Sequence, residues 1–140
     1  MPNLSDIPIR IDNPSFHANA IPLLHEIRHA LRKLAAGGET RIIDLMAIPF
    51  GPGDEDLLLE VLGRGEVEAK VTALGSSRVW ESAYPGVWVL DHRDTDDIRI
   101  AFQVQVTAVP DIVCTPADDM IESTERLDER LQELDASSGK

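Results

Sequence analysis

The chain has 140 residues and a formal net charge of −12 at pH 7, from 25 acidic and 13 basic residues. This acidic excess argues against nonspecific binding to nucleic acids or anionic membranes, because both depend on Lys and Arg side chains that neutralise phosphate. A hydrophobic content of 43% is typical of a globular protein, and the single cysteine excludes an intrachain disulfide and a cysteine-ligated iron–sulfur cluster within one chain.

The first 18 residues contain a short apolar alternation from Ile7 to Ile11 and then a polar stretch. This pattern predicts an N-terminal arm or an edge strand over residues 1–18. The start of the chain lacks the basic region and apolar core of a signal peptide. No apolar run approaches the roughly 20 residues that cross a bilayer, so we expect a cytoplasmic protein without membrane contact.

Helical signals dominate the next part of the chain. Asn19 is placed to cap a first helix over residues 20–36, where apolar residues recur at helical spacing until Gly37. Residues 40–45 form a short strand candidate. Asp54 then caps a second helix, which closes at Gly63.

Strand signals follow from residue 66 onward. Residues 66–73 alternate between polar and apolar, and Gly75-Ser76 resembles a two-residue hairpin turn. Pro85-Gly86 fits the central positions of a type II turn, since proline sets one dihedral angle and glycine permits a positive φ. Residues 98–106 form the most regular strand.

A final helix begins at Thr115-Pro116, and one side of it is apolar. The segment 136–140 is expected to fray. The sequence therefore predicts an α+β fold, with a four-stranded antiparallel meander, one or two extra edge strands and three helices. We expect residues 19–135 to form a single domain.

Pairing across the two hairpin turns predicts the faces of the sheet. With Gly75-Ser76 as the first turn, Val71 pairs with Trp80 and Lys70 with Glu81. Trp88 and Leu90 then lie on the face opposite the core. Large apolar side chains on this second face need a cover, which is either one of the chain's own helices or the N-terminal arm, or else a dimer or partner interface that centres on Trp88 with its indole uncovered by the domain itself. The residues predicted to bind a partner are Trp88, Leu90, Val79, Glu81, Glu66 and Glu68.

The segment His25-Glu26-Ile27-Arg28-His29 matches H-E-x-x-H, in which zinc peptidases place two imidazoles one helical turn apart and a glutamate as general base. Helical spacing puts His25 and His29 nearly opposite the apolar arc, on a face that we expect to be solvated. Arg28 adds a permanent cation, and no third ligand follows at a familiar interval. A solvated helix face is our interpretation, and a zinc site at His25 and His29 is the alternative.

Five blocks of residues occur in a familiar order, and together they resemble the C-terminal domain of bacterial hydrogenase expression/formation proteins of the HupH/HyaF type. The resemblance covers roughly residues 21–134. The blocks are Leu24-x-Glu26-Ile27-Arg28-His29-Ala30-Leu31, Ile43-Asp44-Leu45, Leu62-Gly63-x-Gly65-Glu66-Val67, Glu81-x-x-x-Pro85-Gly86-Val87-Trp88 and Val109-Pro110.

The resemblance implies a cytoplasmic accessory protein, similar in role to a chaperone, that helps to produce nickel-iron hydrogenases. It implies no catalytic residue and no cofactor. We therefore expect a protein that binds a hydrogenase subunit or another maturation protein, without catalysis of its own. Two alternatives remain: a zinc-dependent hydrolase that uses His25, Glu26 and His29, and a homodimeric interaction domain.

Overall fold

The computed structural model describes residues 19–72 and 75–139. The predicted arm over residues 1–18 lies outside this part. The described chain divides between Ala108 and Val109 into two compact units, which are described separately below. None of the described helices is both long and apolar enough to cross a bilayer.

The first unit contains two helices and a five-stranded sheet. The helices are α1 (Ala20–Ala35) and α2 (Asp54–Leu62), and a short 3-10 helix, η2 (Leu45–Ala47), precedes α2. The strands are β1 (Arg41–Asp44), β2 (Glu68–Val71), β3 (Ser76–Glu81), β4 (Val87–Arg93) and β5 (Arg99–Val106). All neighbouring strands are antiparallel, in the order β1-β5-β4-β3-β2. The predicted α+β class and the meander from β2 to β5 are confirmed, and β1 is the extra edge strand.

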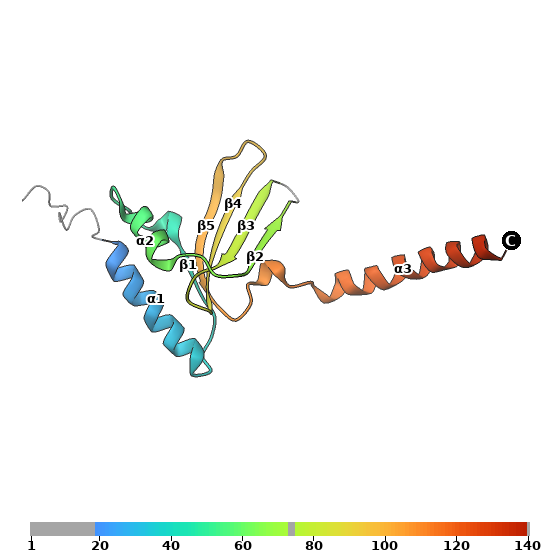
Figure 1. Cartoon of the computed structure of the whole chain (residues 1–140), viewed down its shortest axis with the longest axis horizontal. Helices are drawn as coiled ribbons and strands as arrows, with labels where there is room; N and C mark the ends of the chain where they lie inside the picture. The colour runs from blue at the N-terminus through green and yellow to red at the C-terminus, as the bar shows by residue number, and fades with distance from the viewer. Residues whose placement is uncertain (1–18, 73–74, 140) are drawn as a thin grey trace, which may run out of the picture. The chain divides into compact units, whose positions relative to one another are not determined.

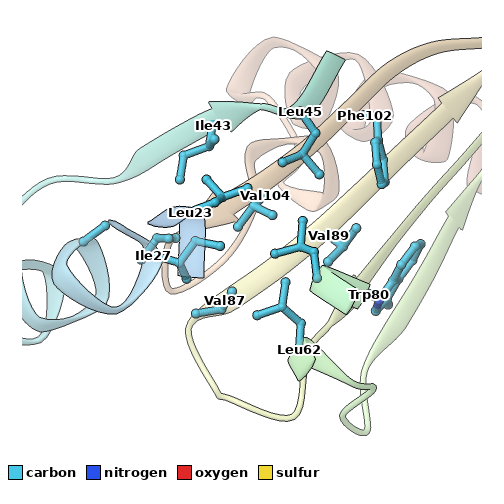
Figure 2. Close-up of a cluster of buried hydrophobic side chains, with 13 residues drawn as sticks. Leu23, Ile27, Ile43, Leu45, Leu62, Trp80, Val87, Val89, Phe102 and Val104 are labelled. Atoms are coloured by element: carbon cyan, nitrogen blue, oxygen red, sulfur yellow. The ribbon is translucent and has the colours of Figure 1, made fainter. Parts of the chain in front are cut away.

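The main core lies between the two helices and one face of the sheet, which we call the first face (Figure 1). Figure 2 shows Leu23 and Ile27 of α1 near Val104, and Leu62 of α2 near Val87 and Val89. The apolar spacing that predicted α1 is therefore the spacing that buries one side of this helix. Trp80 and Phe102 extend the same core along the sheet.

The opposite face, which we call the second face, carries a smaller apolar cluster. Val79, Trp88 and Leu90 are buried there, and Ala69 and Ala101 pack against them. Side chains on this face come from β2, β3, β4 and β5, because cross-strand partners share a face. The sheet is therefore apolar on both faces.

The predicted register of the first hairpin is wrong. In the structure Val71 pairs with Ser77, Lys70 with Arg78, and Glu68 with Trp80. Residues 72–75 thus lie between the end of β2 at Val71 and the start of β3 at Ser76, in place of a two-residue turn. The shift is an odd number of residues, so it moves every side chain of β2 to the other face. Glu68 and Lys70 lie on the first face, and Ala69 and Val71 on the second.

The second hairpin confirms the predicted turn. The N–H of Val87 donates to the carbonyl of Tyr84 at 3.0 Å, and Gly86 has a φ of 98°. Both features are those of a type II turn with proline in its second position. The strand pairing starts further from the turn than predicted, with Glu81 opposite Trp88, yet this even shift leaves the faces of β3 and β4 as predicted.

The second unit contains a short 3-10 helix, η3 (Asp111–Val113), and a long helix, α3 (Ala117–Ser138). The predicted final helix is confirmed, and it continues three residues into the segment that was expected to fray. No residue of α3 is buried.

Candidate interaction surface

Two of the sequence blocks meet at one end of the sheet. The loop after α2 runs beside the end of β3: the N–H of Gly65 donates to the carbonyl of Glu81 at 2.7 Å, and the N–H of Glu81 donates to the carbonyl of Val67 at 2.8 Å. The N–H of Ala83 reaches the carbonyl of Leu62 at 2.7 Å. We call this region the motif junction and define it as residues 62–67 and 81–88.

Glycine is required at two positions of the junction. Gly63 ends α2 with a φ of 63°, which residues with a side chain rarely adopt. A Cβ atom at Gly65 would lie only 2.5 Å from the backbone oxygen of Ser82. The Gly-x-Gly spacing therefore permits a close approach of two backbone segments.

Trp88 is a structural part of the junction. Its side chain is 6% exposed, and its indole N–H donates to the carbonyl of Thr107 at 3.1 Å. The prediction of an uncovered indole is therefore wrong. Val79 and Leu90 are likewise buried, so these three side chains offer almost no area to a partner in this conformation. The sequence indicated their face correctly, and the structure shows that all three side chains are covered.

The three predicted carboxylates have different positions. Glu68 lies on the first face because of the register shift, and it pairs with Arg64 at 3.5 Å. Glu66 is exposed and Glu81 is half-buried, and both belong to the motif junction. Within residues 19–72 and 75–139, neither of these two carboxylates makes a side-chain hydrogen bond or ion pair.

Exposed apolar side chains accompany these two carboxylates. Val67, which pairs with Glu81 through the backbone, is 48% exposed, and Tyr84, in the turn after β3, is 49% exposed. All four residues belong to the motif junction, which therefore carries an exposed aromatic ring, an exposed aliphatic side chain and two carboxylates. Such groups suit a partner with basic and apolar groups.

The H-E-x-x-H residues face solvent on α1. Glu26 forms an ion pair with Arg41, and Arg28 donates to Nδ1 of His25 at 3.0 Å. Glu26 and His29 line a groove of about 560 Å³, whereas His25 lines a separate depression with Ile21, Leu24 and Arg28. The two imidazoles therefore open onto different depressions, and the would-be general base is engaged by a guanidinium.

No group of three or more His, Cys, Asp or Glu side chains in the described part of the chain is arranged to hold a metal ion. We expect that titration of the purified protein with zinc, followed by elemental analysis after gel filtration, recovers no stoichiometric zinc. The reason is that two histidines on a solvated helix face supply too few ligands for a closed or catalytic zinc site. One zinc per chain that disappears in both His25→Ala and His29→Ala would contradict this prediction.

Comparison with known proteins agrees with the motif blocks. Residues 17–134 match the family model described as "HupH hydrogenase expression protein, C-terminal conserved region". Among curated proteins, the chain is similar to the hydrogenase expression/formation protein HoxQ of Azotobacter vinelandii, with 34% identity over 122 residues, covering 84% of this chain and 42% of the relative. It is also similar to the hydrogenase-1 operon protein HyaF of Escherichia coli, with 26% identity, covering 83% of this chain and 40% of the relative.

A solved structure shares the fold. It is the hydrogenase expression protein HupH from Thiobacillus denitrificans, with a TM-score of 0.78 and 37% sequence identity, covering 82% of this chain and 96% of that one. By contrast, the chain spans about two fifths of the length of the curated relatives named above.

Proposed function

Because the chain belongs to the HupH hydrogenase expression protein family, we propose that it is an accessory protein for the maturation of a nickel-iron hydrogenase and acts by binding another protein. The proposed partner is a hydrogenase subunit or another maturation protein, in the cytoplasm. No catalysis by this chain is part of the proposal. The family match over residues 17–134 carries it, together with the relatives, which are named as hydrogenase expression/formation proteins.

We propose the motif junction as the binding surface. The fold accounts for most of the blocks that meet there: Leu62, Val87 and Trp88 are buried, and the glycines serve backbone geometry. The fold gives no comparable structural role to Glu66, Val67 or the carboxylate of Glu81. Side chains that do not stabilise their own domain but lie together on its surface are candidates for recognition.

This surface replaces Trp88 as the direct contact. In this proposal Trp88, Leu90 and Val79 do not contact the partner. Their packing on the second face stabilises β3, the strand that carries Glu81. The carboxylates of Glu66 and Glu81 would orient the partner and raise the association rate constant. Val67 and Tyr84 would contribute the apolar area that is buried on binding.

We expect the double charge reversal Glu66→Lys and Glu81→Lys to lower hydrogenase activity at least about tenfold, because a like-charge contact opposes a basic partner. The measurement is hydrogen uptake in a hydrogenase-producing strain that lacks its own copy of the gene and is complemented with wild-type or variant genes.

The matched control is Asp56→Lys with Glu60→Lys, two exposed positions on α2 with the same total change in charge. It should retain wild-type activity. Circular dichroism and thermal unfolding of both purified double variants report whether each one folds. Full activity in a folded Glu66→Lys, Glu81→Lys variant would exclude the motif junction as the contact surface and leave the family role open.

A further inference from the structure

The helix α3 carries an apolar stripe that nothing in its own unit covers. Met120, Leu127, Leu131 and Leu134 are each about half exposed, and no residue of the 22-residue helix is buried. Figure 1 shows α3 as one continuous helix. A helix of this length gains little from intrinsic propensity alone, so its apolar stripe suggests a second surface that packs on it.

The spacing of the stripe is that of a coiled coil. Its members follow one another at intervals of four, three, four and three residues: Met120, Thr124, Leu127, Leu131 and Leu134. This alternation repeats every 3.5 residues, which keeps the stripe facing one partner helix along its whole length. In heptad notation, Thr124 and Leu131 occupy a positions, and the other three occupy d positions.

The residue types at these positions favour two parallel strands. Leucine at d with β-branched isoleucine or valine at a is typical of parallel dimers. Leu127 and Leu134 occupy d positions and the β-branched Thr124 occupies an a position, whereas Leu131 at a departs from this rule. Thr124 is polar, yet its hydroxyl donates to the carbonyl of Met120 at 3.1 Å. That hydroxyl proton therefore has an acceptor within the helix and needs none from across the seam.

The charges of α3 also fit a second copy. The helix carries eight acidic and two basic residues, yet six of the acidic ones (118, 119, 122, 125, 129 and 133) fall at b, c and f positions, which point away from the seam. The other two acidic residues, Asp128 and Asp135, occupy e positions, as does the apolar Ile121. In a parallel pair, Asp135 of one chain lies beside Arg130 of the other, whereas Asp128 lies beside the uncharged Ser123.

An antiparallel arrangement lacks this complementarity. It brings e positions against e positions, and therefore aspartate against aspartate. Arg130 makes an ion pair with Glu133 of its own helix at 3.0 Å, and its guanidinium has further donors for a partner carboxylate. We propose that α3 forms a parallel two-stranded coiled coil with α3 of a second copy of this chain.

The seam from Met120 to Leu134 covers about two heptads, so the dimer is expected to depend on concentration. Sedimentation velocity of the whole chain over about a hundredfold range of concentration should show a shift from monomer to dimer. We expect Leu127→Asp to raise the dimer dissociation constant at least about tenfold, since it buries a charge in the seam.

The matched control for this variant is Ala136→Asp, which adds the same charge to the same helix at an f position. It should leave the dissociation constant within about threefold of wild type. Circular dichroism of both purified variants shows whether each one is folded. A wild-type chain that is monomeric throughout the range would overturn the proposal.

Cross-linking distinguishes the two orientations. Cys114, which is exposed, is first replaced by serine. Ser138→Cys, at an a position near the end of α3, should then form a disulfide-linked dimer readily under mild oxidation. An antiparallel pair would separate the two thiols by nearly the length of the helix, about 30 Å. Ala136→Cys is the control and should cross-link slowly. Equal cross-linking rates for Ser138→Cys and Ala136→Cys would contradict the parallel seam. A Leu127→Asp variant that dimerises like wild type would contradict it as well.

Discussion

Replacing Asp54 with alanine is expected to lower the free energy of unfolding by about 2–4 kcal/mol, which corresponds to a fall of roughly 10–25 °C in the unfolding midpoint. Asp54 is fully buried. One carboxylate oxygen accepts a hydrogen bond from the N–H of Ala20, at the start of α1, at 3.4 Å, and the other accepts one from the N–H of Gly51 at 2.9 Å. Alanine would leave the buried N–H of Ala20 and the partly buried N–H of Gly51 without this acceptor.

The charge of Asp54 also suits its position. It is the first residue of α2 and touches the first turn of α1, so it lies near the positive ends of two helix dipoles. From the sequence we expected Asp54 to cap α2 and Asn19 to cap α1, but the N-cap residue of α2 is Gly53, and no side chain caps this helix. The side chain of Asn19 instead donates to the carbonyl of Pro49 at 2.7 Å, and Asp54 serves α1 in its place.

Asp56→Ala is the matched control, because Asp56 is exposed in the same helical turn. It should cost about 0.5 kcal/mol or less. Asp54→Asn keeps one acceptor oxygen and should give an intermediate loss. Urea denaturation followed by circular dichroism measures all three variants. If Asp54→Ala were as stable as Asp56→Ala, Asp54 would not link the two helices in the way described.

Gly65→Ala is expected to lower the free energy of unfolding by about 2–4 kcal/mol, because the added methyl group has no room. Its carbon would lie 2.5 Å from the backbone oxygen of Ser82 and 3.2 Å from that of Glu81. Backbone atoms cannot move aside as a flexible side chain can. The loop must therefore retreat and lengthen its 2.7 Å hydrogen bond from Gly65 to Glu81.

Gly139→Ala is the corresponding control, since a Cβ atom there would make only ordinary contacts of 3.4 Å or more and φ is −77°. It should be neutral or slightly stabilising. Thermal unfolding of both variants gives the comparison. A Gly65→Ala variant that matches wild type would mean that the two backbone segments of the motif junction are not held at this separation.

Several elements of the fold could be read from local patterns. The apolar spacing of α1, the positive φ required at Gly86 and the alternation of β5 each depend on neighbouring residues, and the structure confirms all three. The H-E-x-x-H match shows that the spacing of neighbouring residues is not sufficient to predict a metal site. Its spacing is local, but a metal site needs a third ligand from elsewhere in the fold, which spacing on one helix cannot supply.

The predicted contact residues were partly misplaced for a related reason. The predicted register of β2 depended on a two-residue turn at Gly75-Ser76. Because that register is wrong, Glu68 was assigned to the second face but lies on the first. Glu66 and Glu81 both lie in the motif junction, where Gly65 and Val67, the neighbours of Glu66, form hydrogen bonds with the backbone of Glu81. Tyr84 was not among the predicted contact residues, and the structure shows it 49% exposed.

The sequence by itself determined the helices, the meander, the turn at Pro85-Gly86 and the family, because these depend on short-range spacing and on recognisable blocks. Only the tertiary structure decided the register of β2, the burial of Trp88 and the task of Asp54. Each of these depends on which backbone segments, far apart in the sequence, come within hydrogen-bonding distance of one another. Local dihedral preferences and apolar spacing carry no information about which segments approach each other.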